Sequence, residues 1–153
     1  MGGPEPSTGP TGDASPSPAD LILFADEEGN SVRVTVLGAY PGQPHMRSAE
    51  ISVETPFVRG RLDLALWLSR LRQWGHVLDR LEAGEDAAWM NAERGPTLSV
   101  RLRGERDCPE VVVEDVTTSM VTVRVPVDLP DDWLAHHRER LASLLASWSE
   151  HLA

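Results

Sequence analysis

The feature that most constrains this chain is the spacing of its apolar residues, which changes partway along. Apolar and polar residues first alternate, as in Val32, Val34 and Val36, and this spacing is typical of strands that bury one face. A turn at Asp26–Asn30 separates the first two of these stretches. The alternating stretches are 21–25, 32–36, 47–55, 58–66, 98–102, 111–116 and 121–127.

The alternation gives way to helical spacing after residue 66. Apolar residues then recur three and four positions apart, at Leu71, Trp74, Leu78 and Leu81. With Ser69 as N-cap and Gly84 as the stop, the pattern predicts a helix of about 14 residues.

A second helix is predicted at the C-terminal end, opened by Pro130 and the acidic pair Asp131 and Asp132. Short turns between strands favour an antiparallel sheet, and amphipathic helices must cover a face of it. The predicted fold class is therefore α+β, with one antiparallel sheet of about six or seven strands and two helices packed on one face.

The amino-acid composition predicts how the chain divides into a tail and a domain, and which classes of partner the domain can bind. Residues 1–20 are rich in Pro, Gly and Ser and predict a disordered tail, while 21–153 form a single domain. The 24 acidic and 14 basic side chains give a net charge of -10. This charge repels phosphate, which excludes nucleic acid and anionic membrane and favours a protein partner with a basic surface. With no signal-peptide pattern and no long apolar run, we expect a cytoplasmic protein.

The adjacent residues His136 and His137 are the strongest candidates for a metal-binding or catalytic site. Two ligands on one helical face need a spacing of three or four, so adjacent histidines have the wrong geometry for a shared metal. His137 falls on the apolar stripe of the last helix, which predicts a partly buried histidine that is hydrogen-bonded at the sheet. His136 points toward the polar border. We expect no metal site here.

The other candidate motifs for catalysis or metal binding have little support in the sequence. Cys108, the only cysteine, lies beside Asp107 and Glu110, whose negative charges oppose a thiolate. The acidic run 26–30 lacks the ligand spacing of a calcium loop and reads as a hairpin turn. Phosphate-binding glycine motifs and nucleophile elbows are absent from the sequence. We expect no catalytic residue and no cofactor.

Tryptophan is the unusual residue, with 5 Trp against 2 Phe and 1 Tyr. Trp67 falls on the strand face opposite the leucines, together with Arg59 and Arg61. An exposed aromatic beside arginines is typical of binding hot spots, unless a loop or the tail covers it. Trp89 follows the first helix and anchors a loop. The candidate binding residues are therefore Trp67, Arg59, Arg61 and Trp89.

Three stretches resemble a family of small actinobacterial proteins known only as a domain of unknown function. They are "DLILFADEEGNSVRVTVLG", "FVRGRLDLALWLSRLRQWGHVLDRLEAGEDAAW" and "VDLPDDWLAHHRERL". The resemblance is strongest at Gly60–Leu64, Leu71–Trp89 and Leu129–Leu141, and implies no site residues. More loosely, the strand G-R-L-x-L that runs into a helix L-x-x-W-x-x-x-L-x-x-L is similar to immunity proteins of bacterial toxin systems.

Two functions follow as expectations. The first is a non-catalytic protein-binding module, for example an immunity or accessory protein. The alternative is a small hydrolase or transferase whose site is assembled from distant residues such as His45, His137 and Glu114.

Overall fold

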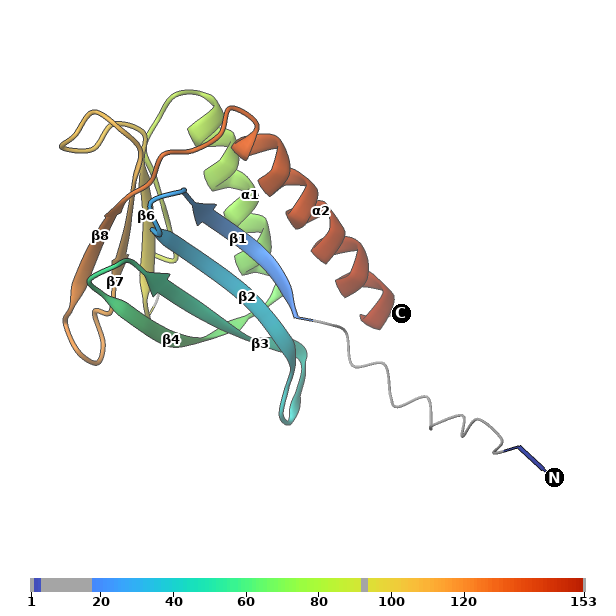
Figure 1. The fold of residues 1–153 in the computed structure, drawn as a ribbon. Coiled ribbons are helices and arrows are strands. Elements are labelled where there is room, and N and C mark those ends of the chain that lie inside the picture. Colours follow the sequence, from blue (N-terminus) through green and yellow to red (C-terminus); the bar gives the residue numbers. More distant parts are fainter. Residues whose placement is uncertain (1, 4–17, 92–93, 153) are drawn as a thin grey trace.

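The chain folds into two four-stranded antiparallel sheets and two helices (Figure 1). The computed structural model describes residues 2–3, 18–91 and 94–152. In chain order the elements are β1 (Ala19–Ala25), β2 (Ser31–Tyr40), β3 (Gln43–Glu54), β4 (Arg59–Leu66), α1 (Leu68–Glu82), β5 (Ala87–Trp89), β6 (Thr97–Arg101), β7 (Glu110–Glu114), β8 (Thr122–Pro126) and α2 (Trp133–Leu152).

The first sheet has the order β1-β2-β3-β4 and follows the predicted alternation. Val32, Val34 and Val36 are buried, as their spacing predicts. The turn between β1 and β2 forms because the carboxylate of Asp26 accepts hydrogen bonds from the backbone N–H groups of Glu28, at 2.9 Å, and Asn30, at 3.1 Å. The predicted hairpin turn is thereby confirmed.

The second sheet has the order β5-β6-β7-β8, so the prediction of one sheet of six or seven strands was wrong. The missed strand is β5, where Trp89 was expected in a loop. Its three residues are too few to carry a visible alternation, and among residues 18–91 and 94–152 they pair with β6 alone. The four strands after α1 pair with one another and not with β1–β4 in the described part of the chain, so they form a separate sheet.

The first helix begins two residues earlier than predicted. Its N-cap is Trp67 rather than Ser69, and the carbonyl of Trp67 accepts bonds from the N–H groups of Arg70 and Leu71. The guanidinium of Arg70 lies 3.8 Å from the Trp67 ring centroid and donates to the carbonyl of Ala65 at 2.7 Å, which ties the first turn of α1 to β4. These contacts, rather than a side-chain cap, set where the helix starts.

The end of α1 is as predicted, with Gly84 in a left-handed conformation at φ 84°. The N–H of Gly84 donates to Leu81 and the N–H of Glu85 donates to Arg80, both at 3.0 Å. This pair of bonds is a Schellman motif, which satisfies the last carbonyls of the helix.

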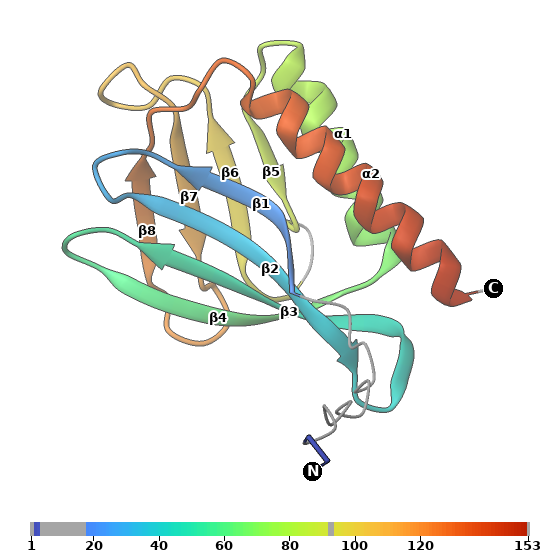
Figure 2. The ribbon, with the colours of Figure 1, turned by 45° about the vertical axis from the view of Figure 1, so that its right-hand side comes forward.

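The two helices pack against each other on one side of the molecule, α2 along β1 and α1 along β5 (Figure 2). They therefore close the space between two sheets, instead of covering one face of a single sheet as predicted. The buried apolar residues of both sheets and both helices form one core, in which the rings of Trp74 and Trp89 lie 5.6 Å apart.

The predicted tail falls mostly on residues 4–17, which lie outside the described part of the chain. Ala19 and Asp20, assigned to the end of the tail, pair with Val36 and Thr35 in the first sheet. Among the described residues, neither helix is long and apolar enough to cross a membrane.

Candidate binding surface

The side of the molecule away from the helices carries two edge strands, β4 of the first sheet and β8 of the second. Each edge strand is preceded by a turn that exposes large apolar side chains. These are Phe57 in the β3–β4 turn and Val116, Met120 and Val121 in the β7–β8 turn, and together we name them the apolar rim.

The β3–β4 turn is held by the hydroxyl of Thr55. It accepts hydrogen bonds from the N–H groups of Phe57, at 3.1 Å, and Val58, at 2.8 Å, while the N–H of Thr55 donates to the Val58 carbonyl. Because the backbone is fixed in this way, the Phe57 side chain stays at the tip of the turn with 95% of its surface exposed.

The β7–β8 turn is held by a carboxylate. Asp115 accepts bonds from both the N–H, at 3.0 Å, and the hydroxyl, at 2.7 Å, of Ser119. These hydrogen bonds hold the pKa of Asp115 below its usual value. The next residue, Met120, has φ 62°, and its side chain is 76% exposed. The left-handed backbone closes the turn, because the N–H of Met120 donates to the carbonyl of Asp115 at 2.8 Å, whereas the exposed apolar side chain has no role in these bonds.

An apolar groove of about 250 Å³ lies between the two sheets beside these turns. Val58 and Leu62 line it from the first sheet, and Val113, Val121 and Val123 line it from the second. The lining also includes Arg59, Gly60 and Arg61 of β4 and the polar residues Asp115 and Ser119 of the β7–β8 turn. We name this feature the β4–β8 groove. Phe57 adjoins Val58 and Met120 adjoins Val121, so the apolar rim continues the groove onto the surface.

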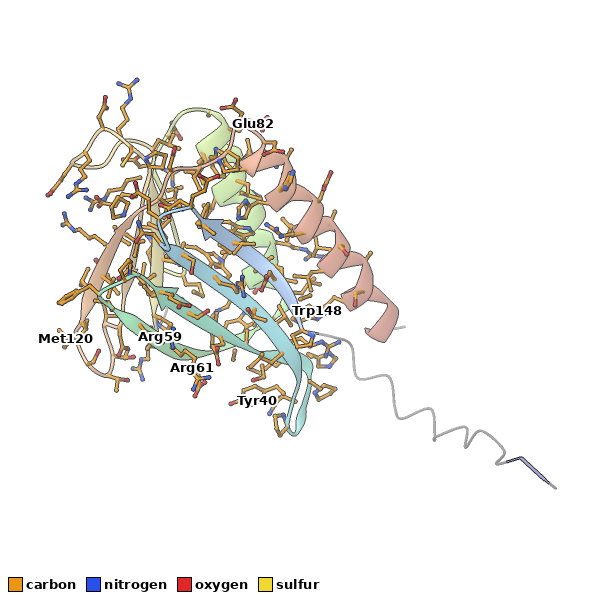
Figure 3. The ribbon with its side chains drawn as sticks, viewed as in Figure 1. Tyr40, Arg59, Arg61, Glu82, Met120 and Trp148 are labelled. Carbon is orange, nitrogen blue, oxygen red and sulfur yellow. The ribbon has the colours of Figure 1, made fainter. Side chains whose placement is uncertain are left out.

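Two of the candidate binding residues lie here. Arg59 and Arg61 extend from β4 with side chains that are 80% and 74% exposed. Arg59 pairs with Glu54 at 2.7 Å, and Arg61 lies 3.7 Å from Glu50. In Figure 3 Arg59 lies on the side of the molecule that carries Met120, and Arg61 lies between Arg59 and Tyr40.

The structure does not bring the two tryptophans to this surface. Trp67 is half-buried under Arg70, about 20 Å along the strand from Arg61 at the usual rise per residue. Trp89 is fully buried, and its indole N–H donates to the carbonyl of Arg70 at 2.9 Å. Trp89 is thus part of the core and has no exposed surface to offer.

The adjacent histidines have different surroundings. His136 is exposed and pairs with Asp132 at 2.9 Å. His137 is buried, and its Nε2 accepts a hydrogen bond from the N–H of Leu23 at 3.1 Å while Nδ1 lies 2.6 Å from the Trp133 carbonyl. The predicted hydrogen bond at the sheet is confirmed, and the burial of His137 is complete rather than partial. Burial lowers the pKa of His137 to about 4.

The distant residues considered for an enzyme are spread over the molecule. His45 is exposed near the start of β3, Glu114 ends β7 in the other sheet, and His137 uses both ring nitrogens in the core. Cys108 is half-buried in the loop before β7. Among the described residues, no three His, Cys, Asp or Glu side chains gather in a way that could hold a metal ion.

A second cavity, of about 550 Å³, lies between the start of the first sheet and α2. Its lining carries both signs of charge, with Asp20 and Glu139 against Arg47 and Arg140. The guanidinium of Arg47 lies 4.9 Å from the Trp148 ring centroid and covers that indole. The mixture of charges favours no one class of ligand.

Sequence reasoning missed the apolar rim. The missed signal is the presence of large apolar residues in turns, where polar residues are usual, as in "TPFVRG" and "TTSMV". The alternation placed Val116 and Val121 at the ends of strands, whereas the structure has both in the turn between β7 and β8, and it makes no statement about Phe57 and Met120.

Together the architecture and this surface define an α+β domain with two antiparallel sheets and an exposed apolar groove between its edge strands. The chain belongs to the family of unknown function DUF5959, whose model matches residues 19–149. No curated protein and no solved structure matches the chain.

Proposed function

We propose that the chain is a non-catalytic protein-binding module whose partner docks on the apolar rim and the β4–β8 groove. The observation that carries this proposal is the exposure of Phe57, Met120 and Val121 at one end of the molecule, on turns held rigid by hydrogen bonds. Contiguous exposed apolar surface is costly in water and typically marks an interaction site.

Charge refines the proposal. A net charge of -10 steers a partner with a basic surface toward the module at long range, while the apolar rim supplies short-range contact. Immunity and accessory proteins of actinobacteria are the biological roles that we propose for such a module. The single cysteine, which forms no disulfide, is compatible with the reducing cytoplasm that we propose as its compartment.

The experiment is recovery of the tagged full chain from its native host, with quantification of co-purifying proteins. The test variant is the double substitution Phe57→Asp and Met120→Asp, which places charge on the rim without touching the core. The matched control is Leu37→Asp, because Leu37 is also an exposed apolar residue, at 43%, but lies on β2 away from the rim.

We expect the wild-type chain and the Leu37→Asp control to retain a stoichiometric partner that the double variant loses. A partner retained equally by all three proteins would contradict the proposed surface. Recovery of free monomer from the wild type would contradict the proposed function itself.

A further inference from the structure

The β4–β8 groove contains a carboxylate within a mainly apolar lining. Asp115 lines the groove with 9% of its surface exposed, and its Oδ2 accepts both hydrogen bonds from Ser119. These bonds hold the pKa of Asp115 below its usual value, so the carboxylate is ionised at neutral pH. Most of the remaining lining is apolar, from Leu62 in β4 to Val123 in β8. A charge in such surroundings needs an opposite charge beside it once a partner removes the water.

This chain does not supply the opposite charge. In the part of the chain that the structure describes, Asp115 forms no ion pair with an arginine or a histidine. Arg59 and Arg61 belong to the lining, but the alternation along β4 directs their side chains to the face opposite Leu62. There they are exposed and pair with two glutamates of β3. The charge of Asp115 is therefore left for a partner to neutralise.

The groove has room for one long side chain. Its volume of about 250 Å³ is below the roughly 300–1,000 Å³ of pockets that hold small-molecule ligands. At Gly60 the groove is open, because a Cβ built there would meet no atom within 4 Å. A purely apolar side chain would fill this space, but it would take water from Asp115 and give nothing in return, which is costly for an ionised group.

From this geometry, and resting on the proposed function, we propose that the partner inserts a lysine side chain into the β4–β8 groove. The aliphatic stem of the lysine packs against the apolar walls, and its ammonium group donates a hydrogen bond to Oδ1 of Asp115. Lysine carries a cation at the end of an apolar stem, so it complements both the walls and the carboxylate. Its positive charge agrees with the basic surface that we propose for the partner, and the apolar rim contacts the residues beside the lysine.

The hydrogen bonds of Asp115 favour lysine over arginine. A guanidinium group pairs best with both oxygens of a carboxylate, but Oδ2 of Asp115 already accepts two bonds from Ser119. An ammonium group needs only one oxygen. The sequence also excludes a second copy of this chain as the occupant, because all 14 of its Lys and Arg positions are arginine.

The experiment uses the full chain and a displayed library of random dodecapeptides as the probe. Enriched peptides are synthesised, and their Kd values are measured by fluorescence anisotropy. Each peptide is also made with its lysine replaced by norleucine, which keeps an apolar stem without the charge, and by arginine. We expect enriched peptides to carry a lysine between apolar residues.

The first protein variant is Asp115→Asn, which removes the charge but keeps an oxygen that can accept from Ser119. Its control is Glu114→Gln, which removes the same charge from the neighbouring residue, outside the groove lining. Asp115→Asn should weaken the lysine peptide about 10- to 100-fold and leave the norleucine peptide unchanged, because a charge-assisted hydrogen bond is lost only with lysine. Glu114→Gln should weaken either peptide less than about 5-fold.

The second protein variant is Gly60→Val, which narrows the groove, with Gly60→Ala as its control. Because the added atoms meet open space, we expect both variants to fold, and thermal unfolding checks this before binding is measured. Gly60→Val should weaken both the lysine and the norleucine peptide about 10-fold relative to Gly60→Ala, since it excludes part of the apolar stem.

Lysine peptides that show these losses support the proposal. Enriched peptides without lysine, an arginine version that binds more tightly than the lysine version, or equal losses for Asp115→Asn and Glu114→Gln overturn it. Kd values that Gly60→Val leaves equal to those of Gly60→Ala also overturn it. If the lysine fails these tests while the Phe57→Asp and Met120→Asp variant still loses the native partner, the proposed function stands and only the occupant of the groove is wrong.

Discussion

The backbone N–H of Leu23 in β1 donates a hydrogen bond to Nε2 of His137 in α2, across 114 positions of the sequence, at 3.1 Å. This bond closes the outer edge of β1, which would otherwise be open for pairing with another strand. The imidazole also stacks on Phe24, with ring centroids 4.6 Å apart. One edge of the first sheet is therefore covered by a helix, whereas the other edge, β4, is open.

The bond to Leu23 predicts a pH dependence of stability. To accept from Leu23, Nε2 must be unprotonated, and burial lowers the pKa of His137 from 6.5 to about 4 in the folded state. The stability contributed by neutral His137 is complete above pH 6.5 and is lost as the pH falls toward 4, because the unfolded chain binds the proton first. The expected loss is about 3 kcal/mol, measured by urea unfolding across this range.

The matched variants separate this effect from general acid sensitivity. His137→Gln can still accept from Leu23 through its amide oxygen but cannot titrate, so its stability should change much less between pH 6.5 and 4. His136→Gln removes only the small charge repulsion from the exposed neighbour, while burial of His137 is unchanged, so this variant should keep most of the wild-type pH dependence. Equal pH profiles for wild type and His137→Gln would show that His137 is not the titrating group.

The buried Trp89 gives a prediction about the core. Trp89→Phe removes the indole N–H that donates to the Arg70 carbonyl and leaves a small void beside Trp74. We expect the free energy of unfolding to fall by about 2–4 kcal/mol, measured by chemical denaturation. Trp67→Phe, at a half-buried position, should cost clearly less, and a larger loss there would contradict the placement of the two indoles.

The end of α1 gives a prediction about backbone conformation. Gly84→Ala places a Cβ on a residue with φ 84° and should lower the free energy of unfolding by about 1–2 kcal/mol. Gly60→Ala, where φ is not left-handed and space is open, should leave stability unchanged or raise it. Thermal unfolding of the two variants side by side makes the comparison, and a loss at Gly60 equal to that at Gly84 would refute it.

The β1–β2 turn gives a prediction at lower pH. Asp26 is partly desolvated, which raises its pKa, but hydrogen bonds from Asn30 and Glu28 outweigh this and lower it below 3.8. The stability contributed by the ionised carboxylate is present above pH 3.8 and lost below it. Asp26→Ala should lower the free energy of unfolding by about 1 kcal/mol at neutral pH. Acidification should then cause no further loss of stability from this site, because the titrating carboxylate is gone; circular dichroism follows unfolding at both pH values. A variant as stable as wild type at neutral pH would show that the turn forms without this cap.

Local patterns in the sequence determined most of the elements. Seven of the eight strands, the stop of α1 at Gly84 and the burial of His137 follow from spacing and turn chemistry, because these are set by neighbours a few residues away. Arg59 and Arg61 were likewise identified as exposed residues from their place in an alternating strand.

Only the tertiary structure decided how the strands divide into two sheets. Sheet membership depends on pairing between distant segments, which alternation does not encode, and β5 is too short to show a pattern. The start of α1 at Trp67 was decided by the Arg70 side chain, and the burial of Trp89 by its contact with Trp74. The β4–β8 groove exists because two edges far apart in the sequence end beside each other, and packing alone brings them together.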